Sequence, residues 1–327
     1  MILFIGLRHD VGGDWNNYIE LITRVAVEQP SWVLSQKDPG YVLVNWASTR
    51  IGWGIYGVNM ISCVIFLAGL THFCWKQPLP SLAWLIATPY LIIVVGMGYT
   101  RQSVALGLIL FAFSLLEKGK VWRFSFLLLL AMTFHRASVV LAPLVLSCVD
   151  GIVLKRIVGR LNLNKNYWSS IVVGVLIVGL AVLAVTLAVR VFHTEIKAYI
   201  YGNQWHSGGG LVRVMMNAVP AILLLCTRNY WTKRFGRSRI WYWLACVAIA
   251  SVVSVLYFST LTDRLSLYLL PLQIYVISRI PMLFDDAAIR GGSIVGISGL
   301  YALVLFVWLN FADHISYWVP YYNLVLP

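Results

Sequence analysis

The segment SSIVVGVLIVGLAVLAVTLAVRVF, residues 169–192, decides the fold that the sequence predicts. It is long enough for a helix to cross a hydrocarbon core of about 30 Å, which takes roughly 17 to 25 residues. Its apolar residues follow one another without the alternation that a strand of a transmembrane barrel would show. The segment therefore predicts a membrane-spanning helix and argues against a barrel.

Segments of the same kind recur from residue 54 to residue 311. The chain is 60% hydrophobic with a mean hydropathy of +0.80, whereas a soluble domain is about half apolar. We predict a single all-α, polytopic membrane domain over residues 1–327. The apolar ILFIG before Arg8 resembles the end of a further helix, which brings the expected number to about 10–11 transmembrane helices. The predicted spans are 54–74, 82–99, 101–116, 121–134, 136–149, 168–192, 211–227, 239–259, 264–283 and 293–311.

The basic residues predict how the chain is oriented in the membrane. When the ten spans are threaded alternately, fifteen Lys and Arg residues lie on one side and ten on the other. Because short cytoplasmic loops carry an excess of Lys and Arg, the richer side is expected inside. Residues 8–53, with helical pieces along the interface, and the loop 193–210 then face outward. The net charge of +13 does not indicate a nucleic-acid partner, since no aromatic-basic binding module is visible.

Four arginines on the outward side share a position, because each begins a span that runs from outside to inside. The first turn of a helix already carries unsatisfied N–H groups and about half a positive charge, so a guanidinium there favours an anionic ligand. The planar fork of arginine matches pairs of phosphate oxygens. We predict a pyrophosphate-binding site, with snorkelling of each side chain to lipid phosphates as the alternative. The four are Arg101, Arg136, Arg213 and Arg264.

Local sequence supports three of these positions. Thr100 and Thr262 are expected to cap two of the helices. The glycines 208–210 would let backbone N–H groups approach a ligand just ahead of Arg213. The outward loop 193–210 is therefore expected to lie at the active site.

His135 precedes one of these arginines, between two short apolar segments, with Ser138 three residues on. Imidazole is the side chain best suited to accept a proton near neutral pH, so His135 is the first candidate for a general base. Asp14 and His206 are further candidates on the outward side, and a structural histidine bonded to a carbonyl is the alternative for His135. No cluster has metal-ligand spacing, so neither a metal nor a cofactor is predicted.

The opening of the chain resembles the EpsG family of Wzy-like exopolysaccharide and O-antigen repeat-unit polymerases. The resemblance rests on LRHDVGGDWNNY, residues 7–18, and on KDPGYVLVNW, residues 37–46. Similar landmarks follow in TRQSVALG (100–107), TFHRAS (133–138), GGGLVR (208–213) and DRLSLYLLPLQ (263–273). Together they cover nearly the whole chain in the family's order.

The resemblance implies a metal-independent glycosyltransferase of GT-C-like membrane architecture. It would join oligosaccharide units carried on undecaprenyl pyrophosphate. The general geometry of glycosyl transfer, with attack opposite the leaving group, favours inversion at the reacting sugar carbon. The active site would face the periplasm or cell exterior of a bacterial inner membrane. The same landmarks suggest substrate contacts at Arg8, Gln102, Asp263 and Tyr268.

Two other functions remain open at this stage. A ligase that transfers the glycan to a different acceptor would use the same arginines. A flippase or transporter of lipid-linked glycan would also place arginines in a cavity, but the span interiors 171–188, 241–256 and 294–309 carry no charged residue. A flippase and a chain-length regulator are possible protein partners of a polymerase.

Overall fold

The computed structural model of the chain describes residues 1–144 and 209–325. Within these ranges the chain forms two compact units. Unit 1 comprises Met1–Leu115, Trp122–Ser138 and Gln273–Pro327, and unit 2 comprises Leu116–Val121 and Val139–Leu272. Each unit is built from helices, and the only strands in the described ranges are two short ones in unit 1.

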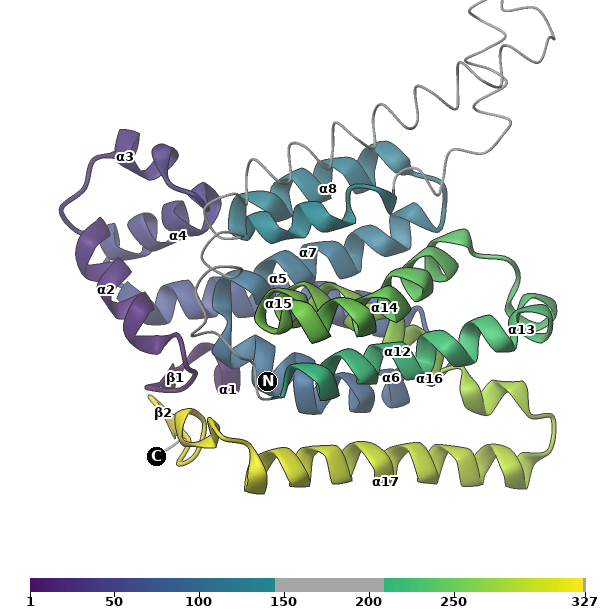
Figure 1. The fold of residues 1–327 in the computed structure, drawn as a ribbon. Coiled ribbons are helices and arrows are strands. Elements are labelled where there is room, and N and C mark those ends of the chain that lie inside the picture. The colour runs from purple at the N-terminus through teal and green to yellow at the C-terminus, as the bar shows by residue number, and fades with distance from the viewer. Residues whose placement is uncertain (145–208, 326–327) are drawn as a thin grey trace, which may run out of the picture. The chain divides into compact units, whose positions relative to one another are not determined.

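Unit 1 begins with short elements, three of which lie against its first long helix (Figure 1). The short elements are α1 (Ile2–Gly6), β1 (Arg8–His9), α2 (Trp15–Val25), α3 (Pro30–Ser35) and α4 (Pro39–Arg50). The three against the long helix are α1, α2 and α4, whereas α3 packs on α4. Proline opens both α3 and α4, where its missing N–H costs no helix bond. β1 pairs antiparallel with β2 (Tyr322–Asn323), so segments from the two ends of the chain lie side by side.

The longer helices of unit 1, except the last, carry its apolar core, since that last helix has a single buried residue, Tyr301. They are α5 (Gly54–Trp75), α6 (Pro80–Ala87) continued by the π-helix η1 (Thr88–Gly96), α7 (Thr100–Leu116), α8 (Val121–Phe134) and α17 (Ala287–Phe311). α5 and α7 approach each other so closely at Gly69 that a Cβ there would overlap the carbonyl oxygen of Gly107. Small residues at such a crossing are what brings membrane helices into contact.

Unit 2 packs three helices around small side chains. They are α12 (Gly210–Cys226), α14 (Arg239–Tyr257) and α15 (Ser259–Ser266), with the short α13 (Arg228–Phe235) between the first two. Ala218, Ala221, Ala245 and Ala248 are fully buried in this packing. The chain continues from α15 through the 3₁₀ turn η3 (Leu267–Leu269) and α16 (Leu270–Ile277) to η4 (Ile280–Leu283).

The chain is an all-α, polytopic membrane protein, as predicted. In the described residues four helices are long and apolar enough to cross a membrane, or five if the bent pair α12–α13 is one span. Three shorter apolar helices cover Pro80–Gly96, Thr100–Leu116 and Val121–Phe134. Eight of the ten predicted spans thus fall on helices. The span 168–192 lies outside the described residues.

Two predicted starts and one predicted helix type were wrong. The span expected at 136–149 begins as the 3₁₀ helix η2 (Arg136–Leu141), and its residues 145–149 lie outside the described residues. α17 begins at Ala287, not 293, because Asp286 accepts a hydrogen bond from the N–H of Ile289 and caps it. The span expected from 264 begins at Ser259.

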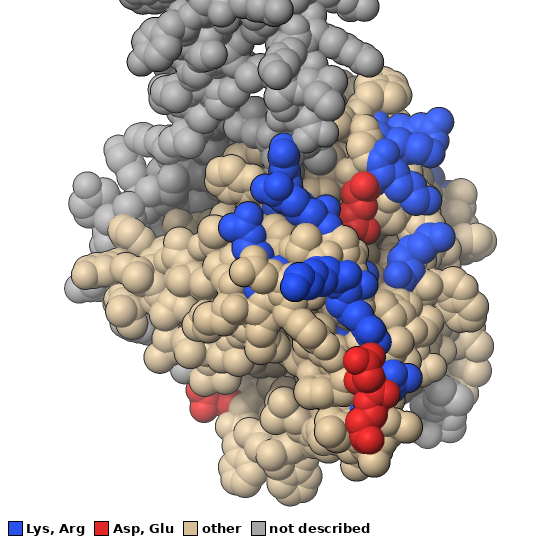
Figure 2. Space-filling model, turned by 90° about the vertical axis from the view of Figure 1, so that its right-hand side faces the viewer, with Lys and Arg blue, Asp and Glu red and all other residues tan. Residues whose placement is uncertain are grey.

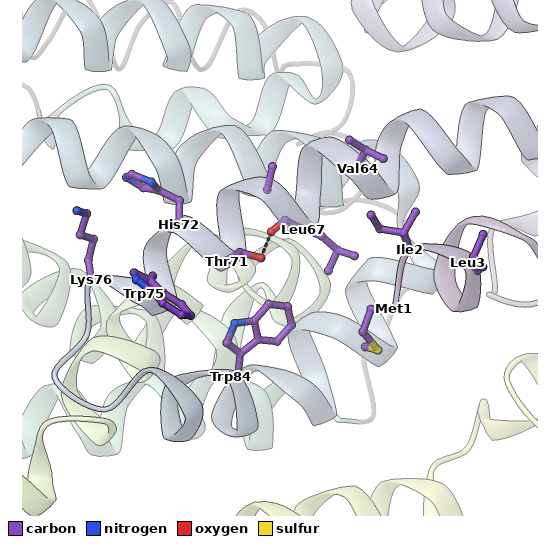
Figure 3. Close-up of a pocket in the computed structure, with 11 residues that line it drawn as sticks. Met1, Ile2, Leu3, Val64, Leu67, Thr71, His72, Trp75, Lys76 and Trp84 are labelled. Atoms are coloured by element: carbon purple, nitrogen blue, oxygen red, sulfur yellow. Dashed lines mark hydrogen bonds between the residues drawn. The ribbon is translucent and has the colours of Figure 1, made fainter.

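Unit 1 also has an open, largely apolar pocket of about 900 Å³ along α5 (Figure 3). Thr71, His72 and Lys76 are its polar lining residues, and none of the predicted site residues lines it.

Candidate functional site

Asp38 brings two of the four predicted arginines together in unit 1. Its Oδ2 accepts a hydrogen bond from Nη1 of Arg101 at 3.2 Å. Its Oδ1 accepts one from the backbone N–H of Arg136 at 3.1 Å. The first arginine lies in the first turn of α7 and the second opens η2. One carboxylate therefore fixes the relative positions of two helix starts that are far apart in the sequence.

Asp38 is more enclosed than its partner. Its side chain is 8% exposed, whereas that of Arg101 is 41% exposed. Burial raises the pKa of Asp38 above its ordinary value, and the charge of Arg101 and the N–H of Arg136 oppose this shift. The charge of Arg101 therefore favours the ionised form of Asp38, whereas burial favours the neutral form.

Tyr18 on α2 connects Asp14 with this pair. Its hydroxyl lies 3.5 Å from Oδ2 of Asp14, and Cζ of Arg101 lies 6.0 Å from the centre of its ring. Burial and the charge of Asp14 raise the pKa of Tyr18 to about 12, against the opposing charge of Arg101. Tyr18 thus remains a neutral donor at pH 7, directed at one of the predicted bases.

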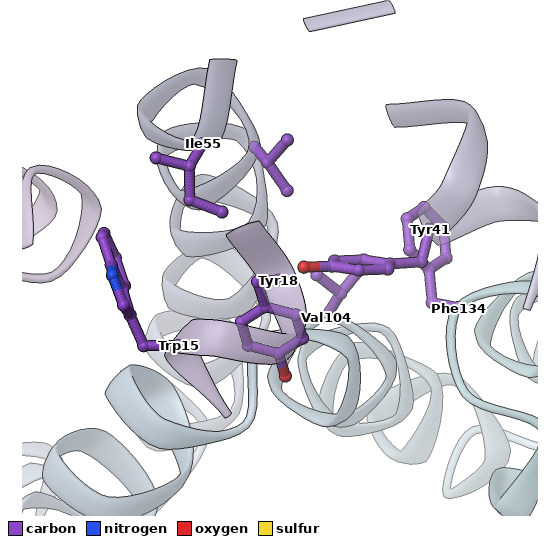
Figure 4. Packing of buried hydrophobic residues seen from close by; sticks show 7 residues of the cluster. Trp15, Tyr18, Tyr41, Ile55, Val104 and Phe134 are labelled. Atoms are coloured by element: carbon purple, nitrogen blue, oxygen red, sulfur yellow. The ribbon is translucent and has the colours of Figure 1, made fainter. Parts of the chain in front are cut away.

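An apolar cluster supports this arrangement from within. Tyr18 and Tyr41, with ring centroids 5.7 Å apart, lie in it among Trp15, Val104 and Phe134 (Figure 4). Its members come from α2, α4, α5, α7 and α8, so the packing joins the short outer helices to the longer ones.

Arg8 is almost completely buried, with 1% of its surface exposed. Its Nη1 donates to the carbonyl of Ile5 at 2.8 Å, and its Nη2 donates to Asn59 at 3.1 Å and to the hydroxyl of Thr100 at 2.7 Å. Among the described residues it has no carboxylate partner. Arg8 thus ties β1 to α5 and to the first residue of α7. Its predicted contact with substrate stays a prediction.

His135 follows the last residue of α8. Its N–H donates to the carbonyl of Ala131 at 2.9 Å, and its carbonyl accepts the N–H of Ser138 at 3.1 Å. The ring is half-buried, whereas Ser138 is fully buried. His135 directly precedes Arg136, so the side chains of the candidate base and of this arginine are attached to adjacent residues.

In unit 2, Arg213 and Asp263 form a bidentate ion pair. Nε of Arg213 donates to Oδ1 at 2.6 Å and Nη2 donates to Oδ2 at 2.5 Å. The two side chains are 26% and 13% exposed. Nη1 of the arginine lies 2.7 Å from the place that a Cβ on Gly209 would take, so the glycine makes room for it. Gly209 is the N-cap residue of α12.

Hydrogen bonds between α12 and α15 fix the geometry of this pair. Nδ2 of Asn217 donates to the carbonyl of Ser266 at 2.9 Å, and the hydroxyl of Ser266 donates to the carbonyl of Asp263 at 2.7 Å. The backbone of α15 near Asp263 is therefore held by a side chain of its own helix and by one of α12.

Arg264 departs from its predicted position. It is the sixth residue of α15 and is exposed, so it does not stand at the start of a helix. The polar residues before it, expected as a loop, form the first turn of α15. Thr262 is not a cap, because its hydroxyl bonds to that of Ser254 at 2.8 Å. Thr100, the other expected cap, is the first residue of α7 and accepts from Arg8.

The remaining predicted site residues are placed as follows. Gln102 is buried in the first turn of α7, and Tyr268 is buried in η3. His206 and most of the loop 193–210 lie outside the described residues.

Sequence reasoning missed Asp38, which organises the unit 1 site. The segment KDPGYVLVNW that contains it was recognised, but only as a family landmark. An acidic residue directly before Pro-Gly at a helix start was the available signal.

In each unit, two predicted arginines accompany one aspartate. Arg101 and Arg136 accompany Asp38, and Arg213 and Arg264 accompany Asp263. In unit 1 the charges of both arginines act on the one carboxylate, which leaves one net positive charge and suits an anionic ligand. In unit 2 Arg213 bonds to Asp263, and Arg264 is the next residue in the chain. In the described residues no three His, Cys, Asp or Glu side chains gather as a metal site would require.

Comparison with protein families matches the EpsG family over residues 1–323. No curated protein and no solved structure matches the chain. The GT-C-like architecture therefore stays a prediction.

Proposed function

The chain belongs to the EpsG family of Wzy-like polymerases, and from this premise we propose that it joins repeat units carried on undecaprenyl pyrophosphate. The family makes it a polysaccharide polymerase of the glycosyltransferase type, embedded in a membrane and acting on a lipid-linked oligosaccharide. The finer proposal adds the pyrophosphate carrier, the outer face of the inner membrane and the residues that perform the reaction.

The proposed reaction forms one bond and breaks one. A sugar hydroxyl of the acceptor unit attacks the anomeric carbon that links the donor glycan to its carrier. The bond from that carbon to the pyrophosphate oxygen breaks, and its electron pair leaves with the pyrophosphate. A base takes the proton of the attacking hydroxyl. Negative charge thus develops on the leaving group, where preorganised donors stabilise the transition state more than the ground state.

The observation that carries the proposal is the pairing of arginines with single aspartates. Each aspartate holds one guanidinium in place before a ligand arrives, which lowers the entropy lost on binding. Within unit 1 Arg101, and within unit 2 Arg213, would donate to a phosphate group of the substrate. Arg136 and Arg264 would add positive charge within their own units. Asp38 and Asp263 are proposed as positioning residues.

The proton is assigned to His135, with Asp14 and His206 as the other candidates. His135 adjoins Arg136 in the chain, so a base there would stand next to one of the proposed pyrophosphate ligands. Asp14 has the hydroxyl of Tyr18 beside it, and none of the proposed pyrophosphate ligands adjoins it in the chain. This comparison favours the histidine.

A reconstituted assay tests the function. Purified protein in liposomes receives the native lipid-linked repeat unit, and a gel resolves the length of the product. We expect a polymer ladder from the wild type and none from Arg213→Ala, with Arg24→Ala on the exposed side of α2 as the matched control. Transfer to a non-glycan acceptor without a ladder would indicate a ligase. Movement of lipid-linked glycan between leaflets without polymer would indicate a transporter.

A further inference from the structure

The short helix α13 lies across the direction of the helix before it. α12 ends at Cys226, and α13 follows after a bend of 82°. If α12 runs across the membrane, an element at nearly a right angle to it runs along the membrane surface. α13 therefore has the orientation of an interfacial helix.

Contacts with α14 fix α13 in this orientation. Trp231 is buried, the guanidinium of Arg228 lies 5.2 Å from the ring centre of Tyr242, and the hydroxyls of Thr232 and Tyr242 are 2.9 Å apart. The helix ends at Gly236, whose φ of +80° suits glycine at a helix terminus. α13 is thus a built part of unit 2, and the directions of its side chains follow from this packing.

The exposed side of α13 and the turn after it is strongly basic. Figure 2 shows Lys and Arg side chains gathered on the face of the molecule on which α13 lies. No Asp or Glu occurs from residue 209 to residue 262, so no acidic side chain of this stretch offsets them. We call the five basic residues the α13 patch: Arg228, Lys233, Arg234, Arg237 and Arg239.

We infer that the α13 patch binds the phosphate head groups of anionic phospholipids. Exposed apolar residues on the neighbouring helices, such as Ile222 on α12 and Val247 on α14, suit the acyl chains. Tyr230 and Trp243 are exposed and aromatic, as is typical of side chains at the head-group level. The apolar, aromatic and basic residues of this surface thus match the acyl chains, the head-group level and the phosphate of a phospholipid. Binding of an acidic protein would require only the basic residues.

This surface is separate from Arg213, the arginine of unit 2 that is proposed to bind pyrophosphate. Arg213 stands in the first turn of α12 and the patch begins after its last residue, which places them about 20 Å apart along the helix. Bound lipid would set the depth of α12 in the bilayer. The inference rests on unit 2 alone and does not depend on the reaction.

Lipid binding by the intact protein tests the inference. The protein in neutral detergent is titrated with phosphatidylglycerol or phosphatidylcholine, and bound lipid is counted by native mass spectrometry. We expect the wild type to prefer phosphatidylglycerol. Lys233→Gln, Arg234→Gln and Arg237→Gln together should lower that affinity about 100-fold, which corresponds to about fivefold per basic residue. The control removes the same charge from the N-terminal part of unit 1 with Arg24→Gln, Lys37→Gln and Arg50→Gln.

Single variants keep the test decisive if the triple variant unfolds. Lys233→Gln and Arg237→Gln should each lower the affinity about fivefold. Equal affinity of wild type and variants for phosphatidylglycerol would overturn the inference, as would equal binding of the two lipids by the wild type. Binding of poly-glutamate with no preference between the lipids would assign the patch to an acidic protein and also overturn it.

Discussion

The two arginine–aspartate pairs use the same chemistry with different geometry. In unit 2, Arg213 gives two short hydrogen bonds to Asp263, and both side chains are mostly enclosed. In unit 1, Arg101 gives one bond of 3.2 Å to Asp38 and keeps 41% of its side chain exposed. The aspartate is the more buried partner in both pairs. The arginine is fixed in one unit and only tethered in the other.

This difference separates two ways of presenting positive charge to a ligand. A bidentate pair holds its guanidinium plane at a defined angle and resists displacement. A single-bonded, half-exposed guanidinium can swing toward a ligand while a backbone N–H continues to hold the carboxylate. We therefore expect Arg213 to contribute to both stability and reaction, and Arg101 to contribute chiefly to reaction.

The largest expected effect comes from removing either arginine. Arg101→Ala and Arg213→Ala should each lower the rate of polymerisation about 10²- to 10³-fold, as expected for loss of a donor to developing negative charge. Arg213→Ala should also lower the free energy of unfolding by about 2 kcal/mol, because it strands a mostly enclosed carboxylate. Polymer assays and thermal unfolding of the same preparations measure both quantities.

The Lys variants sharpen this contrast. Arg101→Lys keeps a charge where only one bond is made, so it should recover part of the rate. Arg213→Lys cannot reproduce the fork and should remain close to the Ala variant. Equal recovery at both positions, or normal polymer from either Ala variant, would remove the distinction between a fixed and a tethered arginine.

A smaller effect should follow from crowding the fixed arginine. Gly209→Ala would place a methyl group 2.7 Å from Nη1 of Arg213, so the guanidinium must shift. Its two hydrogen bonds to Asp263 would then weaken. We expect polymerisation to fall about tenfold, comparable to the loss of one charged hydrogen bond. Because the far end of a flexible side chain absorbs the clash, stability should change little.

Gly292→Ala on α17 is the matched control, since a Cβ there meets nothing within 4 Å. Its rate should equal that of the wild type. If Gly209→Ala polymerised as fast as this control, the orientation of Arg213 would not matter to the reaction.

The sequence predicts the positions of the spans more closely than it predicts the arginine–aspartate pairs, and the reason is physical. A membrane span is recorded in the composition of consecutive residues, so α5, α7, α12 and α14 could be placed closely. The pairs join residues 63 and 50 positions apart, which no local pattern records. The arginines were identified by their places at helix starts, but Asp38 became visible only when α4 and α7 were packed together.

The same limit explains the displaced start of α15. Residues 260–263, which are polar except for Leu261, were expected to lie between the spans 239–259 and 264–283, yet Thr262 is buried and bonded to Ser254 on α14. Packing of α15 against α14 thus overrides the local polarity. Arg264 was placed at a helix terminus because the sequence shows where apolar residues begin, not where a helix begins.

The tethered pair should respond to pH once its arginine is removed. In Arg101→Ala, Asp38 loses the charge that opposes its burial, so its pKa, already raised, should rise further. A carboxyl whose folded pKa exceeds its unfolded value of about 3.9 destabilises the fold above the folded pKa and ceases to do so as the pH falls through it. The stability deficit of this variant, about 1 kcal/mol at pH 8, should therefore shrink at pH 5.

Thermal unfolding of wild type and Arg101→Ala at the two pH values measures this change. Adding Asp38→Asn to Arg101→Ala removes the titrating group and is expected to make the remaining deficit independent of pH. A pH dependence that survives in the double variant would have to come from another group, and the carboxylate of Asp38 would not be the buried charge that Arg101 balances.

The smallest expected effect is that of a chelator. Both pairs owe their proposed role to guanidinium groups, one fixed and one tethered, which supply positive charge without a bound ion. Treatment with EDTA should therefore leave the polymerisation rate within about twofold of the untreated value, since arginine remains protonated at any pH of the assay. Restoration of a lost rate by added Mg²⁺ would assign part of the charge stabilisation to a metal. The two arginine–aspartate pairs would then assist that ion. The contrast between fixed and tethered arginines would concern how the substrate is bound, and not how its leaving group is stabilised.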